Sequence, residues 1–260
     1  MDRDKAIQFV QQNGDAIEQA RLRYLLHGER PSVTIIQSLF NGQQNDGGFA
    51  PFWAPDYSSI DATCYKLAQA EHLGLGATEQ AVVDAVRFLL WRQGDDGRFG
   101  EDPALADSAP PWAAPGDLAA TLYLTANAGF WLAYFGFAEA ARQSADFLAA
   151  HLDARAHKLP SFAQAQWLAC GLAWKLGQDE LVDQLASHLY AQLPGSAGEL
   201  AWMLVTLHSI GFPADRGVIL AGSVRLARMQ TEDGRFPSDE GQDVHTTLEA
   251  LRALANWPTL

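Results

Sequence analysis

The chain has 260 residues, 48% of them hydrophobic, and its 31 acidic and 18 basic residues give a net charge of −13. A chain of this length and composition can bury a core and is predicted to be globular. The acidic balance disfavours nucleic acid and anionic lipid as partners. No apolar run reaches the roughly 18 residues of a membrane span, and the N-terminal segment lacks the apolar core of a signal peptide. With two cysteines and no disulfide framework, we expect a cytoplasmic setting.

Apolar residues three and four apart predict helices along the whole chain, whereas the alternation typical of strands is scarce. In chain order the predicted pairs are 4–12 with 16–27, 31–43 with 62–74, 78–93 with 117–135, 138–152 with 162–177, 179–193 with 197–211, and 216–230 with 244–257. The Pro- and Ala-rich run 102–117 lies within a pair, so we interpret it as an insertion loop. The sequence therefore predicts one all-α domain, residues 1–260, of six helical hairpins.

One motif joins three of these hairpins. The segments QQNDGGF (43–49), QGDDGRF (93–99) and QTEDGRF (230–236) share the pattern Gln-x-x-Asp-Gly-x-Phe, and each follows an amphipathic helix. The Asp-Gly step predicts a turn in which Gly supplies a positive φ. We expect the Gln to bond free carbonyls at the helix end and the Phe to pack back onto the hairpin. The repetition indicates a structural role.

A longer loop follows each motif and leads to a second helix that begins near Asp61, Asp117 or Asp243. Aspartate is a preferred N-cap, worth about 1 kcal/mol, so one interpretation is that all three only cap helices. The other is functional, because variable loops often carry function. Asp61 stands out, since Cys64 and Tyr65 share its predicted helix face.

The motif and the paired helices resemble the repeat shared by squalene and terpene cyclases and the β subunits of protein prenyltransferases. The resemblance implies an α/α toroid, an α6/α6 barrel with six inner and six outer helices around a central apolar cavity. It places Asp61, Asp117 and Asp243 at the mouth of that cavity. Six hairpins make one barrel, whereas full-length class II cyclases have two.

Class II cyclases carry an Asp-x-Asp-Asp-Thr motif whose central Asp protonates a double bond or an epoxide. The segment 59–63 keeps only the central acid, Asp61, and the Thr. The segment 243–247 keeps the first acid, Asp243, and the Thr, with His245 in place of the central Asp. The resemblance therefore implies that Asp61, Asp243 and His245 are the candidate acid and base groups. His245 is otherwise a polar residue on a first helical turn.

The prenyltransferase branch of the resemblance implies a zinc ion held by an Asp, a Cys and a His. The nearest matches are Asp61, Cys64 and His245, although the Asp–Cys spacing is one residue too long and the His lies four repeats away. One carboxylate, one thiolate and one imidazole suit a catalytic zinc site. Cys64 can equally be a small buried hydrophobe. That branch also leaves a helical partner subunit open.

Aromatic residues gather in the loops or first turns of the second helices. Singly, each is typical of a core; together they would form an apolar, π-rich wall suited to an isoprenoid or a developing carbocation. With Asp117 they make up the expected substrate-binding set: Trp53, Tyr57, Tyr65, Trp112, Tyr123, Trp167 and Trp202.

The leading hypothesis is a terpene cyclase-like single barrel that binds or transforms a small hydrophobic molecule by acid/base chemistry, without a cofactor. The alternatives are a zinc-dependent prenyltransferase-like subunit, a non-catalytic binding module, and a carbohydrate-active α/α toroid with carboxylates facing each other. No phosphate-binding Gly-rich loop or Ser-His-Asp pattern is present in the sequence.

Overall fold

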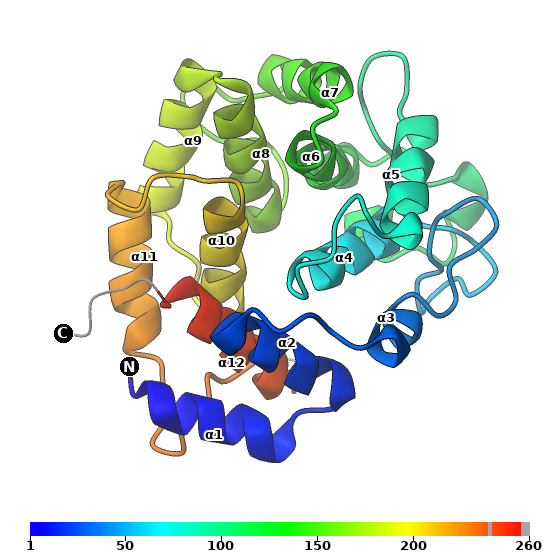
Figure 1. Ribbon diagram of the computed structural model, residues 1–260. Helices are drawn as coiled ribbons and strands as arrows, with labels where there is room; N and C mark the ends of the chain where they lie inside the picture. The colour runs from blue at the N-terminus through cyan, green and yellow to red at the C-terminus, as the bar shows by residue number, and fades with distance from the viewer. Residues whose placement is uncertain (239–240, 256–260) are drawn as a thin grey trace. The chain divides into compact units, whose positions relative to one another are not determined.

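The computed structural model describes residues 1–238 and 241–255, and Figure 1 shows its helices. Within these residues the chain is all-α, with only isolated β-bridges, so the predicted fold class is confirmed. The α-helices are α1 (Arg3–Asn13), α2 (Ala16–His27), α3 (Val33–Leu39), α4 (Ile60–Glu71), α5 (Gln80–Arg92), α6 (Leu118–Tyr134), α7 (Ala138–Ala150), α8 (Ala163–Leu176), α9 (Asp179–Ala191), α10 (Ala197–Ser209), α11 (Gly217–Ala227) and α12 (Asp243–Ala253). The 102–117 loop contains two 3₁₀ helices, η1 (Pro103–Leu105) and η2 (Pro111–Ala113).

The contacts divide the chain into two compact units. Unit 1 comprises residues 1–36, 72–74 and 189–260, and unit 2 comprises residues 37–71 and 75–188. The helices α3 and α9 begin in one unit and end in the other. The prediction of a single domain over residues 1–260 stays a prediction.

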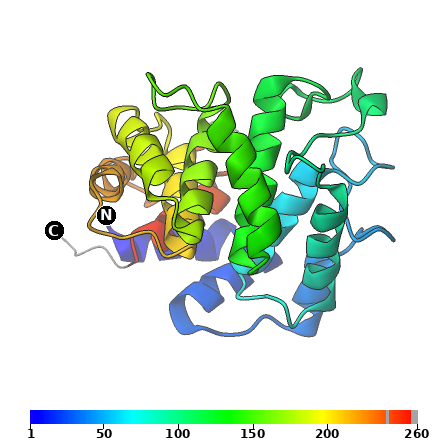
Figure 2. The same cartoon turned by 90° about the horizontal axis from the view of Figure 1, so that it is seen from above.

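Unit 2 is organised around α6. This helix is apolar on all sides and is buried continuously from Leu122 to Ala133, which is typical of a central helix. It packs against α4, α5, α7, α8 and η2, and the views in Figures 1 and 2 show it beside α7 and α8. Asp117 caps its first turn, because its carboxylate accepts from the Ala120 N–H at 2.9 Å.

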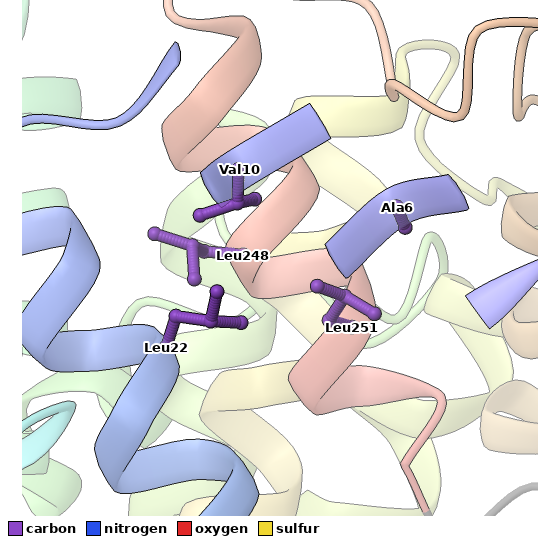
Figure 3. Packing of buried hydrophobic residues seen from close by; sticks show 5 residues of the cluster. All are labelled: Ala6, Val10, Leu22, Leu248 and Leu251. Atoms are coloured by element: carbon purple, nitrogen blue, oxygen red, sulfur yellow. The ribbon is translucent and has the colours of Figure 1, made fainter. Parts of the chain in front are cut away.

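Unit 1 is organised around α12, which packs against α1, α2, α10 and α11. Figure 3 shows a core cluster in which side chains from α1 and α2 meet α12: Ala6, Val10, Leu22, Leu248 and Leu251. All five are buried. A capping box between Asp15 and Glu18 starts α2. None of the helices in the described part of the chain combines the length and apolarity that crossing a membrane requires.

The repeated motif forms a closed turn that reaches the next outer helix. The Gln43 side-chain amide donates to the Gly47 carbonyl at 2.9 Å and to the Ala81 carbonyl of α5 at 2.8 Å. The same pair of bonds runs from Gln93 to Gly97 and Ala140, and from Gln230 to Gly234 and Asp2. The glutamine thus ties its turn to the start of the next outer helix, and the expected bond to the end of its own helix is wrong.

The motif glycines are needed for two reasons. Gly47, Gly97 and Gly234 have φ values of 89°, 84° and 93°, as the Asp-Gly pattern predicts. A Cβ on Gly97 would also lie 2.3 Å from the backbone of Gln143 in α7. Gly47 approaches Asp84 in the same way, and Gly234 approaches Lys5. No side chain fits at this close contact between a turn and a helix.

A threonine on each inner helix fixes the motif phenylalanine. Phe49, Phe99 and Phe236 are buried, as expected, and their backbone N–H groups donate to the hydroxyls of Thr63, Thr125 and Thr247 at 2.9 to 3.0 Å. Each threonine hydroxyl also donates to the carbonyl four residues before it. The threonine that 59–63 and 243–247 share with the class II cyclase motif therefore holds the hairpin together. It also gives a position on which the repeats can be aligned.

Candidate functional site

When the three hairpins are aligned on these threonines, one equivalent position carries a different polar side chain in each hairpin. Two residues before the threonine stand Asp61, Tyr123 and His245. Asp243 lies four residues before its threonine, where the α4 hairpin has Ser59. Asp117 lies eight residues before Thr125. The loops before them differ in length, so the acids fall in different registers.

Two neighbouring side chains hold the Asp61 carboxylate in unit 2. The Tyr123 hydroxyl donates to Oδ1 at 2.8 Å, and Trp112 Nε1 donates to Oδ2 at 3.1 Å. Tyr123 is buried on α6, whereas Trp112 is partly exposed on η2. The Asn127 amide donates to the Tyr123 oxygen at 3.4 Å. Two hydrogen-bond donors therefore converge on one half-buried carboxylate.

Asp61 is not the N-cap of α4. The Glu101 carboxylate takes this role instead, because its Oε1 accepts from the Ile60 N–H at 2.9 Å and from the Asp61 N–H at 3.4 Å. The Ser59 hydroxyl also donates to Oε1, at 2.7 Å, and the Ala62 N–H donates to Ser59. Because Glu101 and Ser59 bond the first N–H groups of α4, the Asp61 carboxylate is not needed as a helix cap. It accepts hydrogen bonds from Tyr123 and Trp112 instead.

Burial dominates the electrostatics of these acids. It raises the pKa of Asp61, while the hydrogen bonds from Tyr123 and Trp112 act in the opposite direction. Burial and the neighbouring Asp61 charge also raise the pKa of Tyr123 well above its ordinary value. The phenol therefore stays a donor, and the carboxyl group holds a proton more readily than an exposed aspartate.

Glu101 is a second acid that the sequence did not reveal. Its side chain is fully buried, and burial raises its pKa, opposed by the Ser59 hydrogen bond and by Arg92. Arg92 Nη2 lies 3.8 Å from Oε2, and its guanidinium lies 5.5 Å from the ring centre of Tyr57. The Tyr57 hydroxyl accepts from the Asp102 N–H at 3.1 Å. Tyr57 thus belongs to the surroundings of Glu101.

The other aromatic candidates have different positions. Trp167 is fully buried in α8, which agrees with a core role, and Trp202 is half-buried in unit 1. Tyr65 is about half exposed on α4, Trp53 is half-buried on the preceding loop, and Phe52 beside it is 89% exposed. The structure instead adds Phe162, whose ring meets that of Tyr123 edge-on at 6.2 Å. Trp112 and Tyr123 therefore contact Asp61 directly, and Phe162 packs behind Tyr123.

Cys64 is a buried free thiol one turn after Asp61. Burial raises its pKa well above the ordinary value, and the charges of Asp61 and Glu101 act in the same direction. Zinc binds the thiolate, so a zinc ion at this position would have to displace the thiol proton. Among the described residues, no group of three or more His, Cys, Asp and Glu side chains is arranged to hold a metal ion.

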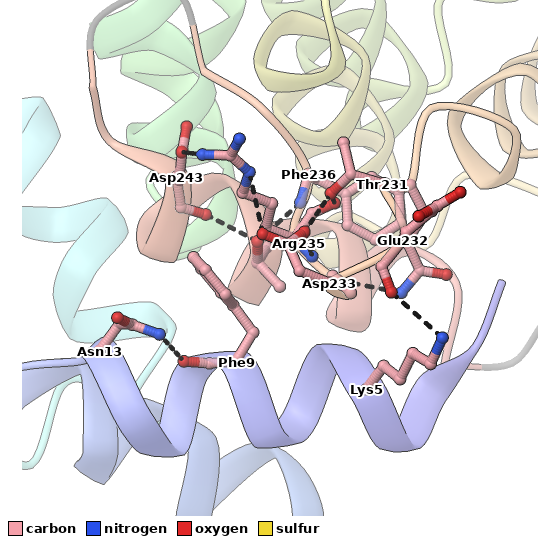
Figure 4. Close-up of polar contacts among 12 residues, drawn as sticks. Lys5, Phe9, Asn13, Thr231, Glu232, Asp233, Arg235, Phe236 and Asp243 are labelled. Carbon is pink, nitrogen blue, oxygen red and sulfur yellow. Dashed lines mark hydrogen bonds and ion pairs between the residues drawn. The ribbon is translucent and has the colours of Figure 1, made fainter.

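His245 lies in unit 1, and both of its ring nitrogens are engaged. Nδ1 lies 2.9 Å from Arg21 Nη1, and Nε2 lies 3.4 Å from Glu249 Oε1. Asp243, two residues earlier, forms an ion pair with Arg235 at 2.8 Å and accepts from the Ser238 N–H at 2.7 Å (Figure 4). Asp243 and His245 therefore have separate partners and do not form a pair.

A surface groove of about 710 Å³ lies in unit 1 between the end of α9 and α11. Its walls are mostly apolar, with two arginines: Tyr190, Gly217, Leu220, Ala221, Val224, Arg225, Arg228 and Met229. None of the residues predicted from the sequence lines this groove.

The crystal structure of a protein from Actinoplanes is similar to this chain, with a TM-score of 0.62, 16% sequence identity and 97% of each chain covered. At this identity the likeness shows the fold alone, because one fold hosts many functions. No protein-family model matches the chain, and no curated protein matches it.

Proposed function

We propose that the chain binds a hydrophobic, isoprenoid-like molecule beside Asp61 and transforms it by acid/base chemistry, with Asp61 as the proton donor. The observation that carries this proposal is the environment of Asp61. A carboxyl group with a raised pKa lies on the first turn of an inner helix, between the hydroxyl of Tyr123 and the indole of Trp112. A general acid needs a pKa near the working pH, and burial moves Asp61 in that direction.

The two donors support this role after the proton has left. When Asp61 gives up its proton, the Tyr123 and Trp112 hydrogen bonds stabilise the resulting carboxylate. Neither donor changes its own protonation state, since Trp is a donor only and the pKa of Tyr123 is well above its ordinary value. Burial thus favours the protonated form of Asp61, and the two donors stabilise the carboxylate once the proton has left.

The aromatic faces support an apolar substrate. Trp112 and Tyr123 lie beside the carboxyl group, Phe162 packs edge-on against Tyr123, and aromatic rings can stabilise a developing positive charge. Glu101 contributes by holding the backbone of Ile60 and Asp61, so that the acid is carried on a fixed first turn.

The test is to incubate the purified full chain with farnesol, geranylgeraniol and squalene and to analyse the products by gas chromatography and mass spectrometry. We expect a cyclised or double-bond-shifted product, and Asp61→Asn should abolish it. The control is Asp15→Asn at the N-cap of α2 in unit 1, because asparagine also caps helices well and should leave conversion unchanged.

Binding can be measured separately by native mass spectrometry of the chain with the same three compounds. Retained binding and lost conversion in Asp61→Asn would support the acid role. Equal conversion in Asp61→Asn and in the unmodified chain would remove Asp61 from the mechanism. Absence of both binding and conversion with all three compounds would overturn the proposed substrate class.

A further inference from the structure

Four ionisable side chains from three segments of unit 1 meet in the interior, and we call them the Arg21 cluster: Arg21, His72, His245 and Glu249. Arg21 comes from α2, His72 follows the last residue of α4, and His245 and Glu249 come from α12. Arg21, His72 and Glu249 are each less than 10% exposed. Buried ionisable groups are costly unless they are paired, so the contacts within this cluster decide its behaviour.

Arg21 contacts both histidines through the same ring nitrogen. Nη1 lies 2.9 Å from Nδ1 of His245, and Nη2 lies 2.7 Å from Nδ1 of His72. A guanidinium group can only donate hydrogen bonds. Both Nδ1 atoms must therefore be acceptors, which fixes both imidazoles as the neutral tautomer with its proton on Nε2.

The protonated nitrogens face Glu249. Its Oε1 lies 3.4 Å from Nε2 of His245 and 3.9 Å from Nε2 of His72. The contacts form a closed ring that runs from Arg21 through one histidine to Glu249 and back through the other. In this state the four groups carry one positive and one negative charge. This ring is a polar connection between α2 and α12.

A proton on His72 breaks this arrangement. It turns Nδ1 into a donor that faces the donors of Arg21, and it places a second positive charge beside the guanidinium. Arg252 on α12 also acts on His72, and His208 on α10 lies near Arg252. Glu71, which is buried, directly precedes His72 in the sequence. Glu249 offsets one positive charge, whereas Arg252 adds to the repulsion.

We propose that the Arg21 cluster is an acid-sensitive latch: it holds α2 against α12 at neutral pH and releases α2 when His72 takes up a proton. The neighbouring core contacts of Leu22 with α12 then lose their polar support (Figure 3). Histidine is the side chain that ordinarily changes its charge in this pH range.

The sign of the effect follows from linkage. Burial lowers the pKa of His72 well below 6.5, with further contributions from Arg21, Arg252 and His245. At a pH above about 6.5, His72 is neutral in both the closed and the open state and has no effect on the equilibrium. Below that value the open state binds the proton and the closed state does not. The opening equilibrium therefore rises by up to about tenfold per pH unit for each proton taken up.

Hydrogen–deuterium exchange of the full chain, corrected for the intrinsic pH dependence of exchange, tests the proposal. Between about pH 8 and about pH 5 we expect the corrected exchange of α2 and α12 amides to rise at least about tenfold. Exchange in α6 of unit 2 serves as the internal reference. Equal pH dependence in α2 and α6 would overturn the latch.

The decisive variant is the double substitution His72→Asn and His245→Asn. The Asn side-chain oxygen is attached to the atom that carries Nδ1 in histidine, so it keeps an acceptor for Arg21 but cannot bind a proton. We expect the acid-induced rise in α2 exchange to disappear in this variant. The matched control is His208→Asn in the same unit, which should keep the rise, since His208 is also a half-buried histidine near Arg252.

Two further measurements keep the test decisive if the double variant does not fold. Arg21→Met keeps the aliphatic stem and removes the charge, so the acid-induced rise should be smaller than in the unmodified chain. The second measurement is a long-range ¹H–¹⁵N spectrum of the unmodified chain at neutral pH. The spectrum should show both His72 and His245 protonated on Nε2. A proton on Nδ1 of either ring, or an unchanged rise in the double variant, would overturn the proposal.

Discussion

Tyr123 and Asp61 occupy the same position in successive hairpins, and the phenol of one donates to the carboxylate of the other at 2.8 Å. The repeat therefore brings a donor and an acceptor together by geometry, because equivalent positions on neighbouring inner helices lie side by side. The bond ties α4 to α6, which also pack against each other. This pairing explains why Asp61 keeps a defined orientation without acting as a helix cap.

Tyr123→Phe should raise the pKa of Asp61 further. The substitution removes the hydroxyl that stabilises the carboxylate and leaves burial, the largest cause of the raised pKa, in place. Carbon-13 NMR of labelled aspartate, with Asp61→Asn for assignment, measures this pKa. Trp112→Phe should act in the same direction, and Tyr190→Phe in unit 1 should have no effect. A lower Asp61 pKa in Tyr123→Phe would contradict the assigned hydrogen bond.

Asp61 also makes stability depend on pH. Its folded-state pKa lies above its unfolded value of about 3.9, so its contribution is fully present below that pH and is lost as the pH rises through the folded pKa. In Tyr123→Phe this loss should extend to higher pH. Urea unfolding at a series of pH values provides the measurement, with Tyr190→Phe as the control whose pH profile should match that of the unmodified chain.

Gly97→Ala should destabilise the fold by about 3 kcal/mol, because it combines a positive φ with a clash against the backbone of α7. Gly177→Ala is the matched control: its φ of 69° is also positive, but nothing lies within 4 Å of the added carbon. That substitution should cost about 1 kcal/mol. Urea unfolding monitored by circular dichroism separates the two, and equal losses would rule out the close contact.

Thr125→Val should cost about 2 kcal/mol, since it leaves the buried N–H of Phe99 without its acceptor at constant side-chain shape. Thr121→Val, one turn earlier on α6, removes only a hydroxyl that donates to the Asp117 carbonyl and should cost less than about 1 kcal/mol. Thermal and urea unfolding provide both values. A larger loss in Thr121→Val than in Thr125→Val would contradict the role given to the motif threonine.

Cys64 and Cys170 should react slowly with an aromatic disulfide reagent in the folded chain. Both thiols are buried, and the raised pKa of Cys64 keeps its nucleophilic thiolate rare at neutral pH. Both should react fully in denaturant, and a single-cysteine variant, Cys170→Ala, isolates the response of Cys64. Fast reaction of Cys64 in the native chain would indicate an accessible thiolate and would renew the case for a zinc ligand.

The motif Gln-x-x-Asp-Gly-x-Phe predicted the hairpin fold because every part of it acts locally or on the next helix. Gly97 and Phe99 each have one role that follows from their residue type, a positive φ and a buried ring. The partner of the glutamine was predicted incorrectly, since the Gln93 amide bonds a carbonyl in α7 that lies 47 residues away in the sequence. Sequence pattern does not reveal such a partner.

The candidate site was only partly predictable. Asp61 was singled out because Cys64 and Tyr65 share its helix face, whereas the partners of its carboxylate, Trp112 and Tyr123, lie 51 and 62 residues away in the sequence. The repeated threonine, Thr63 or Thr247, would have given the true register and would have aligned Asp61 with Tyr123 and His245. Nothing in the sequence pattern pointed to Glu101. It bonds the first N–H groups of α4 only because the fold brings it to Ile60, which lies 41 residues away in the sequence. For the Arg21 cluster, only the i,i+4 spacing of His245 and Glu249 was visible.

The bond between Gln230 and the backbone of Asp2 has a consequence for the order in which the chain folds. It places the last motif against the first helix, and α1 and α2 find their core partner in α12. During synthesis these two helices emerge long before α12, whereas the segments of unit 2 are complete by residue 188. Unit 2 can therefore form while the chain is still being made. The apolar residues of α1 and α2 that pack against α12 lack this partner until α12 has been released.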